Sequence, residues 1–204
     1  MDCRIYLVRH GETMWNASRR LQGHSDVPLS ERGREQAHLL AKRLAKEKIE
    51  CFYCSDLDRA METARILAVP HGLEVSALAG LRELDFGPWE GMTFEEMQKN
   101  RSWNLREWFK NPLDNHVPGG EKLSAMVKRC DLAMENIIRK HEDETIVVVA
   151  HGGSIRCIIC SVLGLRHSQM WRLDLGNTGL SMIEFPPWNK YGVIKLVNDC
   201  THLD

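Results

Sequence analysis

Short apolar segments alternate along the chain with segments whose apolar residues repeat at helical spacing. Residues 5–8 (Ile-Tyr-Leu-Val) and 145–150 (Thr-Ile-Val-Val-Val-Ala) are almost wholly apolar. Continuous apolar runs of this length are typical of strands buried on both faces, as in a parallel sheet. Similar runs predict further strands at 49–55, 181–185 and 193–197, and a strand or extended chain at 78–84.

The segments between these strands have the pattern of amphipathic helices. Leu39, Leu40 and Leu44 form one apolar stripe among charged residues, and Ser30 is a suitable N-cap for the helix that contains them. Strands that alternate with helices indicate an α/β fold, and we expect a three-layer α/β/α sandwich with a mainly parallel sheet. Three further helices are expected at 57–68, 121–140 and 154–163.

Residues 93–120 interrupt this alternation with a polar segment that ends in Pro-Gly-Gly. Thr93 and Glu96 have the spacing of a capping box, so we expect a small helical excursion that covers a pocket like a lid. Because no linker or internal repeat is visible, residues 1–204 are expected to form a single domain. Four side chains of the excursion could contact a ligand, although packing of the lid against the sheet is favoured for them: Trp103, Trp108, Phe109 and His116.

The composition of the chain is that of an ordinary globular protein, with 204 residues of which 43% are hydrophobic and 27% charged. Its net charge of -1 gives no electrostatic basis for binding nucleic acid or an anionic membrane, so an anion site would need a local cluster of cations. No apolar run approaches the roughly 20 residues that span a bilayer. Asp2 and the early position of the chemically active residues argue against a signal peptide, and we expect a cytoplasmic protein. The pattern does not predict the oligomeric state.

The seven cysteines include two C-x-x-C pairs, a spacing that occurs in zinc sites. Cys51 and Cys54 lie in a predicted strand, where side chains three residues apart point to opposite faces. Cys157 and Cys160 lie in an apolar helix without polar ligands beside them. We therefore interpret the cysteines as small buried hydrophobic residues and expect neither a zinc site nor disulfides.

Two of the predicted strands end in the same way, with a histidine followed by a glycine. Val-Arg-His-Gly at 8–11 places Arg9 and His10 at the end of one strand, and Val-Ala-His-Gly at 149–152 places His151 at the end of another. Because parallel strands have their carboxyl ends at one edge of a sheet, we expect the two histidines to face each other across a crevice.

A third junction between strand and helix, at 55–59, adds Arg59 to this edge. Together with Arg9, His10 and His151 it makes a compact cationic group, and guanidinium forks match the oxygens of a phosphate dianion. Neither a GxxxxGK(S/T) loop nor an obvious Asp-rich magnesium site is present in the sequence. The alternative interpretation is that the arginines are surface charges, which is favoured for Arg59 taken alone, and that His10 is a hydrogen-bonded strand-end histidine.

These residues resemble the histidine phosphatase superfamily, which includes the cofactor-dependent phosphoglycerate mutases. The most specific match is Leu-Val-Arg-His-Gly-Glu-Thr at 7–13, followed by Trp15 and Asn16. Further similar segments occur at 22–23, 28–33, 55–60, 81–91 and 151–153. The resemblance covers residues 4 to about 156 and implies the phosphoglycerate mutase-like α/β fold.

The resemblance also implies a phosphoryl-transfer mechanism. His10 would be the nucleophile and would become a phosphohistidine in each turnover. Arg9, Arg59 and a protonated His151 would bind the phosphoryl oxygens. Substrate-binding contributions are implied for Asn16, Gln22, Gly23 and Gly152. Glu12 is expected to hold the loop, and no cofactor or metal is implied.

Glu83 is the predicted proton donor to the leaving alkoxide and then the base for the attacking water. It follows Leu81 and Arg82 in the position of the family's acid. It must be protonated at the first step, which partial burial would favour. Asp85 and Glu90 in the same loop are the competing candidates.

The resemblance is closer to the small phosphatases of the family than to the mutases, which are longer and typically carry Arg-His-Tyr-Gly after the acid. Here Leu-Asp-Phe-Gly stands at 84–87. We therefore predict a phosphomonoesterase for a small-molecule phosphate, similar to α-ribazole, broad-specificity and fructose-2,6-bisphosphate phosphatases. Its substrate could be α-ribazole 5'-phosphate or a broad range of phosphomonoesters. Phosphoglycerate mutase-type transfer is the alternative, and a non-catalytic binding protein on the same fold is a third, less favoured one.

Overall fold

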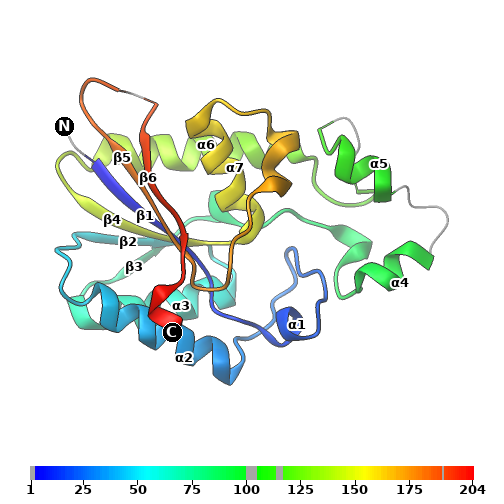
Figure 1. Cartoon of the computed structure of the whole chain (residues 1–204), viewed down its shortest axis with the longest axis horizontal. Coiled ribbons are helices and arrows are strands. Elements are labelled where there is room, and N and C mark those ends of the chain that lie inside the picture. The colour runs from blue at the N-terminus through cyan, green and yellow to red at the C-terminus, as the bar shows by residue number, and fades with distance from the viewer. Residues whose placement is uncertain (1–2, 100–104, 114–116, 190) are drawn as a thin grey trace.

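One sheet organises the computed structural model, whose described residues are 3–99, 105–113, 117–189 and 191–204 (Figure 1). In this part of the chain the sheet has six strands in the order β3-β2-β4-β1-β5-β6. The first four are paired in parallel, β5 pairs antiparallel with β1, and β6 pairs antiparallel with β5. The predicted mainly parallel sheet is therefore confirmed. The strands are β1 (Cys3–Arg9), β2 (Cys51–Cys54), β3 (Val75–Ala77), β4 (Thr145–Ala150), β5 (Leu180–Phe185) and β6 (Val193–Asp199).

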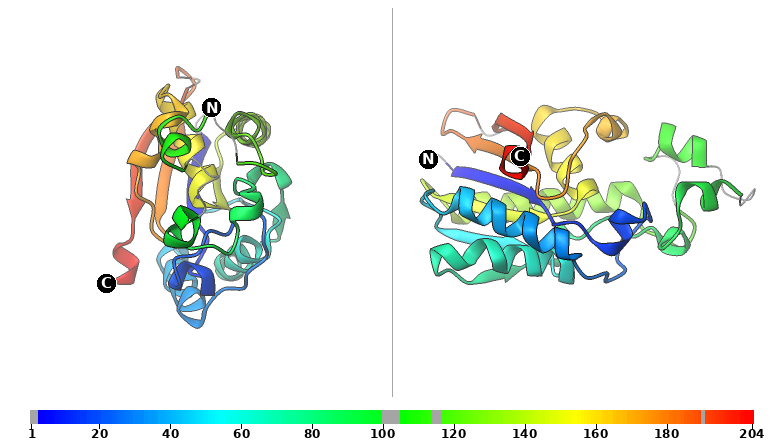
Figure 2. Two further views of the ribbon diagram at one scale, coloured as in Figure 1. Left: turned by 90° about the vertical axis from the view of Figure 1, so that its right-hand side faces the viewer. Right: turned by 60° about the horizontal axis from the view of Figure 1, so that its bottom comes forward.

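Helices cover both faces of the sheet (Figure 2). On one face lie α2 (Glu31–Leu44) and α3 (Asp58–Ala68), and on the other α6 (Leu123–Lys140) and α7 (Gly152–Leu163). None of the described helices is long and apolar enough to cross a membrane. The shorter helical segments are α1 (Met14–Ala17), α4 (Phe94–Lys99), α5 (Leu105–Lys110), and the 3-10 turns η1 (Val69–His71), η2 (Ala79–Leu81), η3 (Gly87–Trp89), η4 (His167–Arg172) and η5 (Thr201–Leu203).

The side chains of β1 alternate between two apolar cores. Ile5 and Leu7 pack with residues of α6 and α7, whereas Tyr6 and Val8 pack with residues of α2 and α3. Both faces of the strand are therefore dry, which explains why its sequence is apolar without alternation. The predicted three-layer α/β/α sandwich is confirmed.

The N-terminus of α2 forms as predicted, but one position of its apolar stripe does not. The Ser30 hydroxyl accepts the backbone N–H of Gly33 at 3.0 Å and so caps the helix. Leu39 is 40% exposed, so its assignment to the buried stripe is wrong. A helix turns by about 100° per residue, which carries Leu39 past the edge of the buried face. That face consists of Gly33, Gln36, Ala37, Leu40, Ala41 and Leu44.

The segment 78–84 was predicted as strand or extended chain, and it contains no strand, so the strand alternative is wrong. β3 ends before it, and the chain then makes the η2 turn. The guanidinium of Arg129 donates to the carbonyl oxygens of Gly80, Arg82 and Glu83 at 3.0, 2.6 and 2.7 Å. A side chain from α6 thus satisfies backbone groups that a neighbouring strand would otherwise have to satisfy.

Two helix starts differ from expectation because of local side-chain bonds. α7 begins at Gly152 rather than at residue 154, since the Ser154 hydroxyl accepts the backbone N–H of His151 at 3.0 Å. The short α1 was not predicted. Its N-cap is Thr13, whose hydroxyl accepts the N–H of Asn16 at 3.1 Å.

The excursion at 93–120 contains α4 and α5, drawn in green in Figure 1. Its capping box is confirmed, because Glu96 N–H donates to the Thr93 hydroxyl at 3.2 Å and Thr93 N–H donates to the Glu96 carboxylate at 2.8 Å. Two of its candidate ligand contacts, Trp103 and His116, lie outside the described residues. That this excursion acts as a lid stays a prediction.

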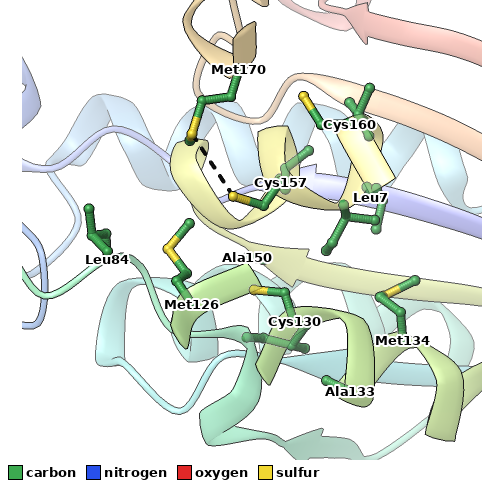
Figure 3. Close-up of a cluster of buried hydrophobic side chains, with 14 of the residues drawn as sticks. Leu7, Leu84, Met126, Cys130, Ala133, Met134, Ala150, Cys157, Cys160 and Met170 are labelled. Atoms are coloured by element: carbon green, nitrogen blue, oxygen red, sulfur yellow. Dashed lines mark hydrogen bonds between the residues drawn. The ribbon is translucent and has the colours of Figure 1, made fainter. Parts of the chain in front are cut away.

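Six of the seven cysteines pack in or against the apolar cores as expected, whereas Cys200 is half-buried outside them. Cys157 and Cys160 are completely buried between α6, α7 and the sheet, and the Cys157 sulfur lies 4.0 Å from that of Met170 (Figure 3). Cys54 packs in the core beneath α2 and α3, whereas Cys51 packs against the opposite one. This C-x-x-C pair therefore cannot direct both sulfurs to one metal ion. All seven cysteines are free.

The start of α2 packs against the loop after β1 through two glycines. A Cβ on Gly33 would lie 2.0 Å from the carbonyl oxygen of Glu12, and one on Gly11 would lie 2.4 Å from that of Gly33. The backbone N–H of Ser30 also donates to the Glu12 carbonyl at 2.8 Å. The loop that follows His10 is thus held by backbone contacts that leave no room for a methyl group.

Replacing Gly33 by alanine is expected to lower the free energy of unfolding by about 2 kcal/mol or more, because the clash exceeds the roughly 1 kcal/mol that alanine gains over glycine inside a helix. Denaturant titration with linear extrapolation measures this change. Gly72→Ala is the control, since nothing lies within 4 Å of its added methyl group and only the positive φ of 64° opposes it. A Gly33→Ala protein as stable as the wild type would contradict the close packing.

Candidate active site

The ends of β1 and β4 place two histidines at the carboxyl edge of the sheet. Arg9 pairs with Ala150 in the parallel register, and the backbone N–H of His10 donates to the Ala150 carbonyl at 3.0 Å. The ring centroids of His10 and His151 are 5.1 Å apart, with their planes inclined by 59°. The structure therefore brings together the two histidines that the repeated strand ending singled out.

His10 is oriented by a backbone carbonyl. Its Nδ1 lies 2.7 Å from the carbonyl oxygen of Gly11, and because a carbonyl only accepts, Nδ1 carries the hydrogen and Nε2 keeps its lone pair. Burial, together with Arg59 and Arg9, holds the pKa of His10 well below its usual value. The imidazole is therefore neutral near pH 7, and its Nε2 has the electron pair that a nucleophile needs.

Two guanidinium groups with buried atoms flank the histidines. Arg59, from the start of α3, is completely buried and donates to the carbonyl oxygens of Ser25 at 2.9 Å and Gly23 at 2.7 Å. Arg9 donates to the Leu175 carbonyl at 2.5 Å. Burial lowers the pKa of both arginines, that of Arg9 to about 10, which leaves both protonated near pH 7. The alternative that Arg59 is a surface charge is wrong.

Both arginines have an Nε–H group that is available to a ligand. The Nε atoms of Arg9 and Arg59 are buried and have no partner among the described residues. Their partners are carbonyl oxygens, which carry only partial charge, so the positive charge of each group is not cancelled. Such an arrangement favours an anion with several acceptor oxygens.

His151 lies beside His10 and is completely buried. Neither of its ring nitrogens has a hydrogen-bond partner among the described residues. Burial, together with Arg59 and His10, holds the pKa of His151 well below its usual value. With these neighbours alone the imidazole is neutral near pH 7, and protonation of His151 beside a phosphoryl group stays a prediction. A phosphoryl dianion beside it would shift the balance back toward the charged form.

Glu83 brings a carboxylate to the same place. Its two oxygens accept the backbone N–H groups of Gly153 and Leu84, both at 2.8 Å. A Cβ on Gly153 would lie 2.1 Å from Glu83 Oε1, so the carboxylate lies directly on the first turn of α7. Protonation of Glu83 at the start of the reaction stays a prediction.

The two competing carboxylates hold loops instead. Glu90 accepts the backbone N–H groups of His24, Ser25 and Phe86 at 2.8, 2.8 and 3.1 Å. The carboxylate of Asp85 accepts the backbone N–H of Gly87 at 2.7 Å. Neither carboxylate lines the cavity into which Glu83 projects.

These side chains surround one cavity of about 180 Å³ that is partly open to solvent. Most of the site residues predicted from the sequence line it: Arg9, His10, Asn16, Gln22, Gly23, Arg59, Glu83 and Gly152. His151 is completely buried and is not among the lining residues, although its ring lies 5.1 Å from that of His10. Glu12 does not line it either, and its carboxylate accepts the Ser30 hydroxyl at 3.0 Å, which fits a role in holding the loop.

The side-chain amides of Asn16 and Gln22 are the neutral polar groups that line the cavity. The side-chain carbonyl oxygen of Asn16 accepts hydrogen bonds from the backbone N–H of Thr13 at 3.1 Å and from the amide of Asn177 at 3.2 Å. The oxygen is thereby engaged, which leaves the side-chain amide hydrogens of Asn16 for the cavity that it lines. Gln22 also lines the cavity, and its buried Oε1 has no partner among the described residues.

The sequence interpretation missed two residues after α7 that hold the backbone of Arg9 and His10 in place. Asn177 donates its amide to the His10 carbonyl at 3.0 Å, and the backbone N–H of Thr178 donates to the Arg9 carbonyl at 3.0 Å. Thr178 is held at a φ of 54°, a rare conformation for a β-branched residue. No sequence signal links these residues to the histidines, because the contact exists only in the folded chain.

Arg156 was also missed, although a signal for it exists. It lies one helical turn after Gly152, and it lines the cavity. Its Nε donates to the Leu173 carbonyl at 2.7 Å. Helical spacing from the His-Gly-Gly motif could have identified it, since residues four apart lie on the same face of a helix.

A group of possible metal ligands lies elsewhere, at the opposite edge of the sheet. In the described part of the chain, ligand atoms of Cys51, His141 and Glu144 lie within 4.8 Å of one another. Both ring nitrogens of His141 are already engaged, Nδ1 with Glu144 at 2.5 Å and Nε2 with the Tyr53 hydroxyl at 2.8 Å. The group is therefore satisfied as a chain of hydrogen bonds, remote from the histidines that end β1 and β4.

The fold and the paired histidines agree with the family to which the sequence matches. A profile of the histidine phosphatase superfamily (branch 1) matches residues 5–199. The chain therefore belongs to the histidine phosphatase superfamily.

Individual relatives carry both mutase and phosphatase names. The chain is 47% identical over 157 residues to phosphoglycerate mutase-like protein 4 of Arabidopsis thaliana, which covers 76% of this chain and 68% of that one. It is 37% identical over 203 residues to the protein named probable phosphoglycerate mutase GpmB of Serratia proteamaculans, covering 98% and 94%.

Solved structures of the same fold include phosphatases. YhfR of Bacillus stearothermophilus has a TM-score of 0.92 at 30% identity and covers 99% of this chain and 100% of its own. Phosphoserine phosphatase of Entamoeba histolytica, solved in complex with phosphoserine, has a TM-score of 0.88 at 29% identity, with coverage of 99% and 100%. The superfamily and these neighbours support a phosphatase enzyme.

Replacing His151 by glutamine is expected to flatten the loss of stability at low pH. In the unfolded chain this histidine titrates near pH 6.5, whereas its pKa in the folded protein is well below that value. The unfolded state therefore binds more protons as the pH falls through 6.5, so stability is fully present above this pH and is lost below it. Each such group contributes a slope of about 1.4 kcal/mol per pH unit.

Denaturant titrations between about pH 7.5 and pH 5 would measure this slope. The exposed His38 on α2 provides the control, since His38→Gln removes an imidazole that does not line the site. A slope that is the same in His151→Gln as in the wild type would mean that His151 titrates alike in the folded and the unfolded protein, which would contradict the lowered pKa.

Proposed function

We propose that the protein is a phosphomonoesterase that hydrolyses a small-molecule phosphate ester through a phosphohistidine on His10. The observation that carries the proposal is the neutral His10 imidazole, whose Nε2 is free while its Nδ1 hydrogen is bound by the Gly11 carbonyl at 2.7 Å. It lines the same cavity as Arg9 and Arg59, the cations that would hold the phosphoryl oxygens, and both of them lower its pKa.

In the first step Nε2 of His10 attacks phosphorus, and the bond between phosphorus and the ester oxygen breaks. Arg9, Arg59 and His151 stabilise the charge on the phosphoryl oxygens, and the buried Nε atoms without partners supply donors for them. The leaving alkoxide takes a proton from Glu83. The imidazole ring then carries a positive charge, which the Gly11 carbonyl stabilises at Nδ1.

In the second step water attacks the phosphohistidine. Glu83, now a carboxylate, takes a proton from this water, and the bond between phosphorus and Nε2 breaks. Inorganic phosphate leaves, and both His10 and Glu83 return to their starting protonation states. Because every charge that develops meets an arginine, a histidine or a carbonyl of the chain, the proposal needs no metal ion.

The substrate is proposed to be a small phosphorylated molecule, either α-ribazole 5'-phosphate or one of a broad range of phosphomonoesters. Phosphatases among the structural neighbours support this choice. The cytoplasmic location stays a prediction from the sequence.

Phosphoglycerate mutase-type transfer is the second candidate, because relatives of similar length carry that name. The two functions share the first step and differ in what receives the phosphoryl group. A non-catalytic binding protein is less well supported, since it would not need the complete set of His10, Glu83 and the cations.

Covalent labelling tests the proposed first step. The wild-type protein, mixed with radiolabelled p-nitrophenyl phosphate in EDTA and quenched in alkali, is expected to retain label on His10. His10→Ala should retain none, and His38→Ala should label like the wild type, since His38 is exposed on α2. Equal labelling of His10→Ala would overturn the covalent mechanism, and loss of all labelling in EDTA would overturn the metal-free proposal.

A chase of the labelled enzyme separates the two functions. With water as the acceptor, label should appear as inorganic phosphate even when unlabelled 3-phosphoglycerate is present. Appearance of the label in phosphoglycerates without net release of phosphate would instead assign the mutase function.

Replacing Glu83 by glutamine is expected to lower kcat for an alkyl phosphate by about 10² to 10⁴, because the alkoxide then leaves without a proton. The loss should be smaller for p-nitrophenyl phosphate, whose leaving group is stable as an anion. Asp85→Asn is the matched control, since it neutralises a nearby carboxylate outside the cavity lining. Equal losses for both esters would argue against Glu83 as the acid.

A further inference from the structure

Aromatic side chains gather along one side of the cavity, and we call them the aromatic wall. Its members are Phe86, Trp89, Trp108, Phe109 and Trp171. Trp108 is the central ring, since its centroid lies between 4.9 and 5.9 Å from those of the other four. All five line the same cavity as Arg9 and His10. They come from the loop after Glu83, from α5 and from η4, so only folding assembles them.

The aromatic wall is more than the packing of a helical excursion onto the sheet. Trp108 is 3% exposed, as packing alone would predict. Phe109, however, is 37% exposed, and Trp171 is partly exposed. These two rings touch at a centroid distance of 5.5 Å and present open apolar surface to the cavity.

Arg156 joins the aromatic wall to the cationic edge. Its guanidinium carbon lies 5.7 Å from the centroid of the Trp171 ring, in cation–π range. A Cβ on Gly152 would lie 3.0 Å from Arg156 Nη1 and 3.6 Å from Arg9 Nε, so the two guanidinium groups meet at the start of α7. The aromatic wall therefore begins directly beside the groups that would bind a phosphoryl group.

We propose that the leaving alcohol of the substrate carries an aromatic ring, which packs on Trp171 and Phe109 while the phosphate binds at His10. This inference rests on the proposed phosphomonoesterase function and adds the substrate class. An aromatic ring against such a cluster gains edge-to-face contacts beyond the burial of its area. A glycerate or similar polar group would instead lose its hydrogen bonds to water, because the ring carbons of Trp171 and Phe109 cannot replace them. Its binding there would therefore be unfavourable.

Three phosphate esters with alkoxide leaving groups of similar basicity test the proposal. Benzyl phosphate carries the aromatic ring, cyclohexylmethyl phosphate an aliphatic ring of similar size, and glycerol 3-phosphate a polar chain. The wild-type kcat/KM is expected to be about 10-fold higher for benzyl phosphate than for glycerol phosphate, and about 3-fold higher than for the cyclohexyl ester.

Variants of the aromatic wall then locate the effect. Trp171→Ala should lower the ratio of kcat/KM for benzyl over glycerol phosphate by about 3- to 10-fold, mainly through KM, and Trp171→Phe should restore most of it. Phe109→Ala provides a second truncation at a more exposed position, should Trp171→Ala fold poorly. Trp188→Ala is the matched control, because Trp188 is 79% exposed and does not line the cavity.

The outcomes separate this inference from the proposed function. Equal kcat/KM for all three esters, or a higher value for 3-phosphoglycerate than for benzyl phosphate, would overturn the ring-binding inference and leave the phosphatase reaction standing. Equal kcat/KM for the benzyl and cyclohexylmethyl esters would overturn the claim that the bound ring is aromatic. An unchanged ratio in both truncations would overturn the assignment to Trp171 and Phe109. If no ester is hydrolysed and no phosphohistidine forms, the proposed function fails, and this inference fails with it.

Discussion

The parallel pairing of β1 with β4 is the constraint on which the rest of the site depends. With Arg9 opposite Ala150, both strands end at the same level, and His10 and His151 follow at once. A slip of one residue would turn the side chains of a strand to the opposite face. Because side chains of β1 and β4 pack in the apolar cores on both faces of the sheet, such a slip would exchange these side chains between the cores and disrupt the packing of both. The register of the sheet therefore determines the distance between the two histidines.

The second constraint is electrostatic. The fold holds Arg9 and Arg59 with backbone carbonyls at 2.5 to 2.9 Å. The carboxylates of Glu83, Asp174, Asp26 and Glu90 act on their charge from a distance, and among the described residues none of them forms an ion pair with either guanidinium group. Carboxylate partners would neutralise the guanidinium groups and compete with a phosphate. Carbonyl partners orient the groups and leave their charge for a ligand. The same burial keeps His10 neutral, so one environment maintains both the electron pair and the cations around it.

Reaction and recognition come from different parts of the chain. The groups of the proposed reaction stand at the carboxyl ends of β1 and β4 and at the starts of α3 and α7, which the sheet holds rigidly. The aromatic wall comes from the loop after Glu83, from α5 and from η4, where η4 packs against α7 and α5 packs against η4. Structures of the same fold carry names that refer to different phosphate esters, which fits a common reacting edge with a separate wall for the leaving group.

Much of the fold and of the candidate site could be predicted from the sequence, because the patterns involved are local. Apolar runs without alternation determined the buried strands, Ser30 determined the start of α2, and the repeated His-Gly ending identified His10 and His151. The errors arose where a distant side chain intervenes, as when Arg129 binds the carbonyls of Gly80 and Arg82 and turns a predicted strand into a 3-10 turn.

Only the tertiary structure decided the environment of these groups. Whether His151 is protonated depends on burial and on Arg59 and His10 beside it, which no local pattern encodes. The contact of Asn177 with the His10 carbonyl joins residues 167 positions apart. The residue types that are proposed to do the chemistry were therefore determined by the sequence itself, whereas their charge states, their supports and the aromatic wall beside them depend on contacts that exist only after the chain has folded.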